Sequence, residues 1–387
     1  MFTSRRITVM GGDKFRDEFS LAFDGVAEYI ELGSQAGDLR LSGSNGSIFA
    51  WVKPVLTGDD YQRVVDKSDE ANAANGYAML IHDDGQLRGA MDGATRVYSS
   101  TGALKANEWA HVGYSWNGSM HYMWINGVLA ASASDTTMPP SDTTNMRIGT
   151  WNHATAREFK GKISEVVIYS TAFSSANVRR IYNGREPYDH ANGISQWALE
   201  AWWRMGDGTF DQISTGDNEG GIICDMNNLS LGADVLGGKG DFSDASYWEL
   251  LNNSTGQTDR VEISSGVCQF KYDGSNNTNG AIRKTGILTA GKIYRIDMDI
   301  TANSGTSVFL DEGNPYIRIN PSEGDTGSYT VYWRASVNDL RIYRYDSTGD
   351  SYDQTATIDN VVIREVTGGN HGNMVNMHPL DFEGDTP

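Results

Sequence analysis

Tyrosine and arginine residues alternate with apolar residues along two segments near the C-terminus, SYTVYW and LRIYRY. Successive side chains of a β-strand point to opposite faces. One set of alternate positions is apolar and is expected to face a core: Val331, Trp333, Leu340 and Ile342. The other set is then expected to share the opposite, exposed face: Tyr332, Arg334, Arg341, Tyr343 and Tyr345. Such a stripe of rings and guanidinium groups binds a glycan or a protein partner, unless a neighbouring subunit or domain covers it.

A second candidate binding residue is a tryptophan on an expected loop. Trp151 is followed by Asn152 and His153, directly after the segment RIGT. An indole in such a position either stacks on a ligand or packs against another chain. Both interpretations stay open, and the three residues are candidate ligand-binding residues.

The sequence lacks the residue patterns that support catalysis. Retaining glycosidases need two carboxyl groups about 5 Å apart, which a Glu-x-Asp-x-Glu strand provides on one face. Asp297 and Asp299 share a face in RIDMDI, but no glutamate accompanies them, and no nucleophile-elbow, His-Glu-x-x-His or phosphate-loop pattern occurs. Four histidines stand singly and are expected to be exposed polar loop residues: His153, His190, His371 and His378. We therefore expect a protein that is not an enzyme.

Many short strands must position these residues. The chain has 387 residues, a length that suits two or three domains. Its 44 glycines, abundant aromatic residues and 21% charged residues favour sheets with many turns over helical bundles. Asp84-Gly85, Asn117-Gly118 and Asn126-Gly127 lie between alternating runs and predict β-hairpins. One helix is predicted, from Ser174 to Tyr182, with a serine cap.

The fold class that follows is all-β, with two β-sandwich (jelly-roll) domains, a short connector and a C-terminal tail. The predicted divisions are an N-terminal anchoring arm (1–19), a first sandwich (20–187), an aromatic connector (188–238), a second sandwich (239–366) and a tail that packs with the connector (367–387). The connector and the tail are both rich in large apolar residues, which predicts that they contact one another. The second sandwich is then an insertion between them.

Acidic residues outnumber basic ones by 50 to 31, which gives a net charge of -19 and a pI near 4.7. Such a surface repels phosphate backbones and anionic lipids, so we expect no nucleic-acid partner and no membrane insertion. No apolar run approaches the roughly 20 residues that span a bilayer, and no secretory signal is expected at the N-terminus. Cys224 and Cys268 form no metal or redox motif and are expected to be free thiols.

The first sandwich resembles the laminin G-like, concanavalin A-like jelly rolls. The matching stretches occur in the order of that family: SLAFDGVAEYIEL, SIFAWVKP, NGYAMLIHDDGQLRG, NEWAHVGYSWNGSMHYMWINGVL, RIGTW and FKGKISEVVIYSTAFSSANVRRIY. The resemblance implies the fold strongly. It implies function only weakly, because the fold hosts lectins, glycosidases, adhesion modules and structural units.

The second sandwich resembles the carbohydrate-binding modules that are attached to polysaccharide hydrolases. Its opening GDFSDASYWELL and its closing TIDNVVI match the two ends of those modules. The stretch WWRMGDG and the tail NMVNMHPLDFEGDTP are similar to phage structural proteins that carry a laminin G-like domain. In those proteins the two stretches follow one another directly, whereas here the second sandwich lies between them.

Both resemblances imply a structural calcium ion, which takes oxygen ligands and ties strands together. In the second sandwich the matching carboxylates are Asp359 and Asp241. In the first sandwich the closing strand of the family reads Asp-Glu-Val, and here it reads Ser164-Glu165-Val166. Glu165 is kept as a candidate ligand, although the serine removes one charged ligand from that site.

Together these patterns predict a non-enzymatic phage virion protein, such as a capsid decoration, fibre or tail-associated subunit, that also touches host glycans. It would be made in the host cytoplasm, contact other virion proteins, and form a homo-oligomer or assemble on a particle. The basic residues of its arm would dock on an acidic partner surface: Arg5, Arg6, Lys14 and Arg16. The alternatives are a bacterial cell-surface carbohydrate-binding protein and, third, a glycoside hydrolase.

Overall fold

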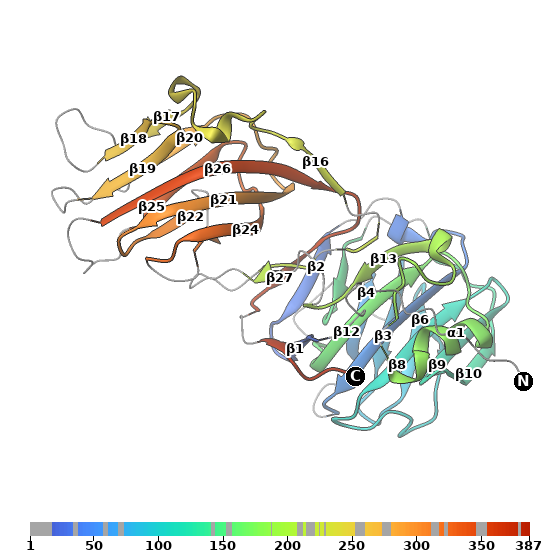
Figure 1. The fold of residues 1–387 in the computed structure, drawn as a ribbon. Helices are drawn as coiled ribbons and strands as arrows, with labels where there is room; N and C mark the ends of the chain where they lie inside the picture. The colour runs from blue at the N-terminus through green and yellow to red at the C-terminus, as the bar shows by residue number, and fades with distance from the viewer. Residues whose placement is uncertain are drawn as a thin grey trace, which may run out of the picture.

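The structure is a computed structural model of the chain. It describes residues 18–33, 38–56, 61–68, 73–140, 144–151, 157–186, 188–206, 212–213, 221–223, 225–227, 230–251, 260–272, 280–310, 317–320, 324–345, 354–377 and 381–387. Strand accounts for 51% of the structure and helix for 8%, which confirms the all-β prediction. Two sandwiches lie side by side (Figure 1). The predicted N-terminal arm, apart from Glu18 and Phe19, lies outside the described residues.

The first sandwich consists of two antiparallel sheets. The eight-stranded sheet has the order β10 (Val128–Ser134), β9 (Met120–Ile125), β8 (Ala110–Trp116), β3 (Gly46–Pro54), β12 (Lys160–Tyr169), β1 (Ser20–Asp24) and β28 (Phe382–Glu383), and β13 (Leu199–Trp203) also pairs with β12. The nine-stranded sheet has the order β14 (Gln212–Ile213), β15 (Gly221–Ile223), β27 (Gly372–Val375), β2 (Tyr29–Gly33), β11 (Met146–Ile148), β4 (Gln62–Lys67), β5 (Tyr77–Ile81), β6 (Leu87–Met91) and β7 (Ala94–Tyr98).

Turn residues set the hairpins of this sandwich where the sequence predicts them. Asp84-Gly85 lies between β5 and β6, Asn117-Gly118 between β8 and β9, and Asn126-Gly127 between β9 and β10. Asn126 and Gly127 have φ angles of 49° and 77°, the left-handed values that a two-residue hairpin needs at both central positions. The predicted hairpins are therefore confirmed.

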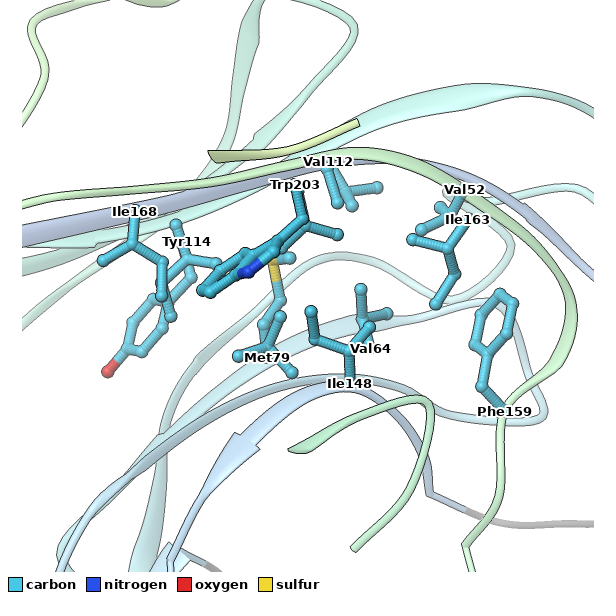
Figure 2. Close-up of a cluster of buried hydrophobic side chains, with 14 of the residues drawn as sticks. Val52, Val64, Met79, Val112, Tyr114, Ile148, Phe159, Ile163, Ile168 and Trp203 are labelled. Carbon is cyan, nitrogen blue, oxygen red and sulfur yellow. The ribbon is translucent and has the colours of Figure 1, made fainter. Parts of the chain in front are cut away.

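Large apolar side chains from both sheets fill the space between them (Figure 2). Trp203 lies at the centre of this core and is fully buried. It comes from the predicted connector, and the tail adds Met374 and Met377 to the same core. The core of the first sandwich is therefore built from segments on both sides of the second sandwich.

The connector and the tail contribute strands to the sheets of the first sandwich. In the nine-stranded sheet, β27 of the tail lies between β15 of the connector and β2, with Met374 opposite both Gly221 and Ile30. In the other sheet, β13 pairs with β12 and β28 pairs with β1. The two segments are thus part of the first sandwich, which extends beyond the predicted boundary at residue 187. Trp197, by contrast, is 78% exposed and does not take part in this packing.

The second sandwich also has two sheets. The six-stranded sheet has the order β18 (Arg260–Ser264), β19 (Val267–Tyr272), β26 (Gln354–Thr367), β21 (Ile293–Asn303) and β24 (Gly327–Arg334), and β16 (Ser230–Asp234) also pairs with β26. The five-stranded sheet has the order β17 (Glu249–Leu251), β20 (Ala281–Lys284), β25 (Leu340–Tyr345), β22 (Ser307–Leu310) and β23 (Ile317–Arg318). All four residues that were predicted to face the core are buried there: Val331, Trp333, Leu340 and Ile342.

Helix is confined to short segments. The predicted helix is α1 (Ser175–Tyr182), and the Ser174 side chain caps it by accepting a hydrogen bond from the Asn177 amide at 3.3 Å. Its buried residues, Val178 and Ile181, pack on the outside of the eight-stranded sheet. The 3-10 turns are Asp38–Arg40, Asn183–Arg185, Gln196–Ala198, Lys239–Asp241 and Ala245–Tyr247. No described helix has the length and apolar character needed to cross a membrane.

Two buried histidines on the outside of the eight-stranded sheet, His111 and His190, predict acid sensitivity. The predicted exposure of His190 is wrong, because its ring packs between Tyr169 and Trp202. Burial lowers the pKa of His111 and of His190 to about 3, whereas an unfolded histidine titrates near 6.5. The unfolded state therefore binds more protons below pH 6.5, and stability falls as the pH drops from 6.5 towards 3. Burial raises the pKa of Asp66 and of Asp225 to about 6, and these two groups act in the opposite sense.

The contribution of one histidine to the pH dependence of stability can be measured with a phenylalanine variant. The His111 ring stacks on Phe49 with a distance of 5.6 Å between ring centres, so another aromatic ring suits this position. In His111→Phe we expect the loss of unfolding free energy between pH 7 and pH 5 to be about 2 kcal/mol smaller than in the wild type. Urea melts at the two pH values measure this difference. An unchanged pH dependence in the variant would contradict it.

Candidate functional site

One row of side chains crosses the outer face of the nine-stranded sheet. Arg63 is opposite Leu80, Leu80 is opposite Arg88, and Arg88 is opposite Tyr98. Side chains that are directly opposite across a ladder share a face of the sheet. The neighbouring residue Gly89 faces the core, because a Cβ there would meet the ring of Tyr114. Arg88 and Tyr98 therefore point away from the core, and Tyr98 is 59% exposed.

Arginine side chains and aromatic rings alternate across this surface, which we call the arginine–aromatic face. Its members are Tyr29, Tyr61, Arg88, Tyr98, Arg147, Trp151 and Arg157. The Arg88 guanidinium carbon lies 5.3 Å from the Tyr61 ring centre and 5.9 Å from that of Tyr98. Arg157 lies 5.5 Å from the Tyr61 ring and 4.2 Å from the Trp151 ring. All these separations are within cation–π range.

The chain between β11 and β12 brings the distant members of the face together. The Arg63 amide donates to the Arg157 carbonyl at 3.0 Å, and the Phe159 amide donates to the Gly149 carbonyl at 2.7 Å. Arg147 donates to the Trp151 carbonyl at 3.2 Å, and its guanidinium carbon lies 4.6 Å from the Tyr29 ring centre. Trp151, which the sequence singled out, is therefore a half-buried member of the face. Asn152 and His153 lie outside the described residues.

A buried ion pair supports the face from below. Arg63 and Asp66 are 1% and 0% exposed, and the Arg63 Nε lies 2.9 Å from Asp66 Oδ2. The Ser68 hydroxyl donates to Asp66 Oδ1 at 2.6 Å. Burial raises the pKa of Asp66 to about 6 and lowers that of Arg63, since each charge has lost its water. The two side chains compensate one another's charge on the buried side of the face.

Within the described residues, the face combines aromatic rings with guanidinium groups, and its neighbouring carboxylates are paired. Glu31 accepts from Arg147 Nε at 2.7 Å, so both acidic residues in this part of the sheet are paired with arginine. At the tip of the β5–β6 hairpin, His82 Nδ1 lies 2.9 Å from carboxylate oxygens of both Asp83 and Asp84. Within the described residues, these three form the one group of three or more acidic, histidine or cysteine side chains with ligand atoms within 4.8 Å. The geometry suits binding by rings and charged donors.

The predicted tyrosine–arginine stripe of the second sandwich does not form one surface. Tyr332 and Arg334 belong to β24 of the six-stranded sheet, whereas Arg341 and Tyr343 belong to β25 of the five-stranded sheet. The turn between the two strands crosses from one sheet to the other, so the two pairs lie on opposite outer faces. The side chain of Tyr345 lies outside the described residues.

The exposure of this stripe was also predicted wrongly. Tyr332 and Tyr343 are each only 8% exposed. Tyr332 packs with Ile293 and Val366, and the Tyr343 ring lies 5.8 Å from that of Phe309. Neither tyrosine offers a ring face of the kind that Tyr98 does. Ligand binding by the four residues stays a prediction.

The three candidate calcium ligands lie in different environments. Asp241 is exposed, and its Oδ1 accepts from the amide and hydroxyl of Ser243 at 3.0 and 2.8 Å, which holds its pKa below the usual value. Asp359 lies on β26 opposite Asp299, and its Oδ1 accepts from the Asn360 amide at 2.7 Å. Neither aspartate belongs to a group of three acidic side chains in the described part of the chain. Calcium binding there stays a prediction that would need backbone carbonyl ligands.

Glu165 has a different role from the predicted one. It is 4% exposed and accepts from Arg204 Nε at 3.0 Å and from the Trp202 indole. These contacts neutralise its charge and join β12 to β13. A carboxylate that is committed to a guanidinium group does not fit a calcium site, so Glu165 is removed from the candidate ligands.

Sequence patterns could have found part of the arginine–aromatic face. Arg88 lies between Leu87 and Gly89 in one alternating segment, and Tyr98 follows Val97 in the next. The alternation alone could therefore have predicted that both side chains point away from the core. Tyr61 and Arg157 carry no such signal, because they come from the ends of loops. Only the folded chain brings all of them to one surface.

Comparisons with known proteins relate the first sandwich to a known family. The profile of the family described as the concanavalin A-like lectin/glucanases superfamily, Laminin_G_3, matches residues 24–179. Among curated proteins no sequence matches significantly. Similar solved structures include a putative carbohydrate binding protein from Bacteroides ovatus, with 18% identity and a TM-score of 0.39 over 55% of this chain and 56% of that chain. The present chain thus spans little more than half the length of that protein.

Two further structures cover less of the chain. The sialidase module CBM40 of Ruminococcus gnavus, bound to α2,3 sialyllactose, has 15% identity and a TM-score of 0.37 over 42% of this chain and 95% of that chain. A heptameric SAP-like pentraxin from Limulus polyphemus has 14% identity and a TM-score of 0.34 over 46% of this chain and 85% of that chain. The resemblance of the first sandwich that was stated from the sequence is confirmed, because residues 24–179 match the family model of the concanavalin A-like lectin/glucanases superfamily.

Proposed function

We propose that this chain binds glycans without catalysing a reaction, and that the arginine–aromatic face is its binding surface. The observation that carries the proposal is the exposed ring of Tyr98 beside the Arg88 guanidinium, on an outer sheet face of a lectin-like domain. A flat ring stacks on the apolar face of a pyranose, and the adjacent N–H groups donate to its hydroxyl groups. The surface provides both from rigid strands.

Burial favours this face over the second sandwich. Tyr98 is 59% exposed, whereas Tyr332 and Tyr343 of the predicted stripe are each 8% exposed. Glycosidic bond cleavage needs one carboxylic acid and one free carboxylate on either side of the bond. On the arginine–aromatic face the carboxylates of Glu31 and Asp66 are instead paired with arginines, which supports a binding role.

The experiment compares two exposed aromatic residues of the first sandwich. Tyr98→Ala should weaken the glycan binding of the intact chain about tenfold, the value of one stacked ring. Trp197→Ala removes a ring that is 78% exposed in the 3-10 turn Gln196–Ala198, away from the face, and should leave affinity unchanged. A glycan array identifies the ligand and titration calorimetry measures the affinities, with melting curves to verify folding.

Two outcomes would contradict this assignment. If the intact chain binds no glycan on the array, the glycan-binding function is wrong. If it binds a glycan and Trp197→Ala weakens binding as much as Tyr98→Ala, the function stands but the surface is wrong.

We also propose that the chain is a structural component of a phage particle, as a capsid decoration, fibre or tail-associated subunit. The support is the resemblance of WWRMGDG and of the tail to phage structural proteins, together with the way these segments share the first sandwich. The alternative is a carbohydrate-binding protein of a bacterial surface. Mass spectrometry of purified virions separates the two, because only the first assignment places the chain in the particle with other virion proteins.

A further inference from the structure

Arg88 lies between two tyrosine rings of the arginine–aromatic face. Its guanidinium carbon is 5.3 Å from the Tyr61 ring centre and 5.9 Å from that of Tyr98. The side chain is half-buried and comes from β6, in the middle of a ladder with β5 and β7. A guanidinium group in such a place is held in position by rigid neighbours. Its orientation therefore costs little conformational entropy when a ligand binds.

The charge of Arg88 is not matched by a carboxylate in the described residues. Glu31 pairs with Arg147 at 2.7 Å, and Asp66 pairs with Arg63 at 2.9 Å. The Nε of Arg88 donates to Gln86 Oε1 at 3.0 Å, and that acceptor is a neutral amide. The aspartates of the nearby hairpin tip, Asp83 and Asp84, contact His82 instead. The terminal N–H groups of Arg88 are the charged donors that a ligand would meet beside Tyr98.

A carboxylate is the ligand group that fits this arrangement best. Arginine binds carboxylates through two parallel N–H···O bonds, which are about twice as strong as hydrogen bonds between neutral groups. The chain as a whole has a net charge of -19, which repels anions at long range. At physiological ionic strength this repulsion is screened beyond about 8 Å, so the local contact decides affinity.

We propose that the arginine–aromatic face selects glycans that carry a carboxylate, with the carboxylate on Arg88 and the sugar ring on Tyr98. This inference rests on the proposed glycan-binding function and names its ligand class. Uronic acids and sialic acids both present a ring with an attached carboxylate, so the shared chemistry is that of an acidic sugar.

The test uses ligand pairs that differ in charge. The intact chain is titrated with a sialylated oligosaccharide and its desialylated form, and with an oligogalacturonide and its methyl ester. We expect the acidic member of at least one pair to bind about tenfold tighter than its neutral partner. The pair that shows the preference identifies the source of the carboxylate.

Variants then assign the preference to one side chain. Arg88→Gln should remove most of the tenfold preference for the acidic glycan, because it loses the pair of charged donors, and should weaken binding of the neutral glycan much less, because the glutamine amide can still donate to a hydroxyl group. Arg88→Lys keeps the charge without the planar pair of donors and should retain part of the preference. Arg180→Gln is the matched control, because Arg180 is exposed on α1 over the other sheet and the charge change is the same.

The outcomes separate this inference from the function on which it rests. Equal affinity for acidic and neutral glycans, or a preference that survives in Arg88→Gln, overturns the acidic-sugar assignment while glycan binding stands. Absence of binding to every glycan tested overturns the proposed function and this inference with it.

Discussion

Replacing Trp203 by alanine is expected to lower the unfolding free energy of the first sandwich by about 3–5 kcal/mol. The indole is fully buried at the centre of the core (Figure 2). Its removal leaves a cavity that the surrounding strands cannot fill. The indole Nε1 also donates to the Asn370 carbonyl at 2.8 Å, so the variant loses a hydrogen bond between the connector and the tail. Chemical denaturation of the intact chain measures the change.

Trp197→Ala is the matched control for this experiment. Its side chain is 78% exposed, and we expect a change within about 0.5 kcal/mol. If Trp203→Ala lowers the unfolding free energy by less than about 1 kcal/mol, the connector is not part of the core. Replacing a buried tryptophan by alanine typically lowers it several times more.

Removing one partner of the buried Arg63–Asp66 pair is expected to have an effect of similar size. Asp66→Ala leaves the Arg63 guanidinium buried without its carboxylate, which typically costs about 3–5 kcal/mol. The double variant Arg63→Met with Asp66→Leu removes both charges and should recover most of the loss, since apolar residues of similar volume replace buried pairs well. Thermal and urea unfolding of the three proteins give the values.

The partly exposed pair on the same sheet provides the comparison. Glu31 and Arg147 are each 21% exposed, so Glu31→Ala should cost only about 0–1 kcal/mol. If Asp66→Ala lowers the unfolding free energy no more than Glu31→Ala does, the Arg63 charge does not depend on Asp66 for compensation. The role described for the buried pair would then be wrong.

The fold followed from local signals that act within a few residues. Asparagine–glycine and aspartate–glycine turns fix the hairpins because few other residues adopt the required φ angles, and Ser174 caps the helix by the same local logic. Alternation also placed Trp333 and Ile342 in the core of the second sandwich. These features need no knowledge of which strands are neighbours.

The candidate site depended on strand neighbours and was mostly missed. Tyr98 and Arg88 share a surface only because β7 lies beside β6, and Arg157 joins them from a loop between β11 and β12. The tyrosine–arginine stripe failed for the complementary reason. The alternation of side chains shows which residues of one strand share a face. It does not show that the turn after Arg334 crosses to the other sheet.

The position of β27 determines when the first sandwich can be completed during synthesis. Ile30 and Met374 pair directly, and β27 lies inside the sheet, beside β2 (Figure 1) and with β15 on its other side. When the chain has emerged from the ribosome only as far as residue 367, every described strand of the second sandwich is available, whereas the first sandwich still lacks β27 and β28. The second sandwich can therefore fold first, whereas the nine-stranded sheet of the first sandwich is completed only when β27 has emerged. Partners that recognise the closed nine-stranded sheet can bind only after translation has passed the end of β27.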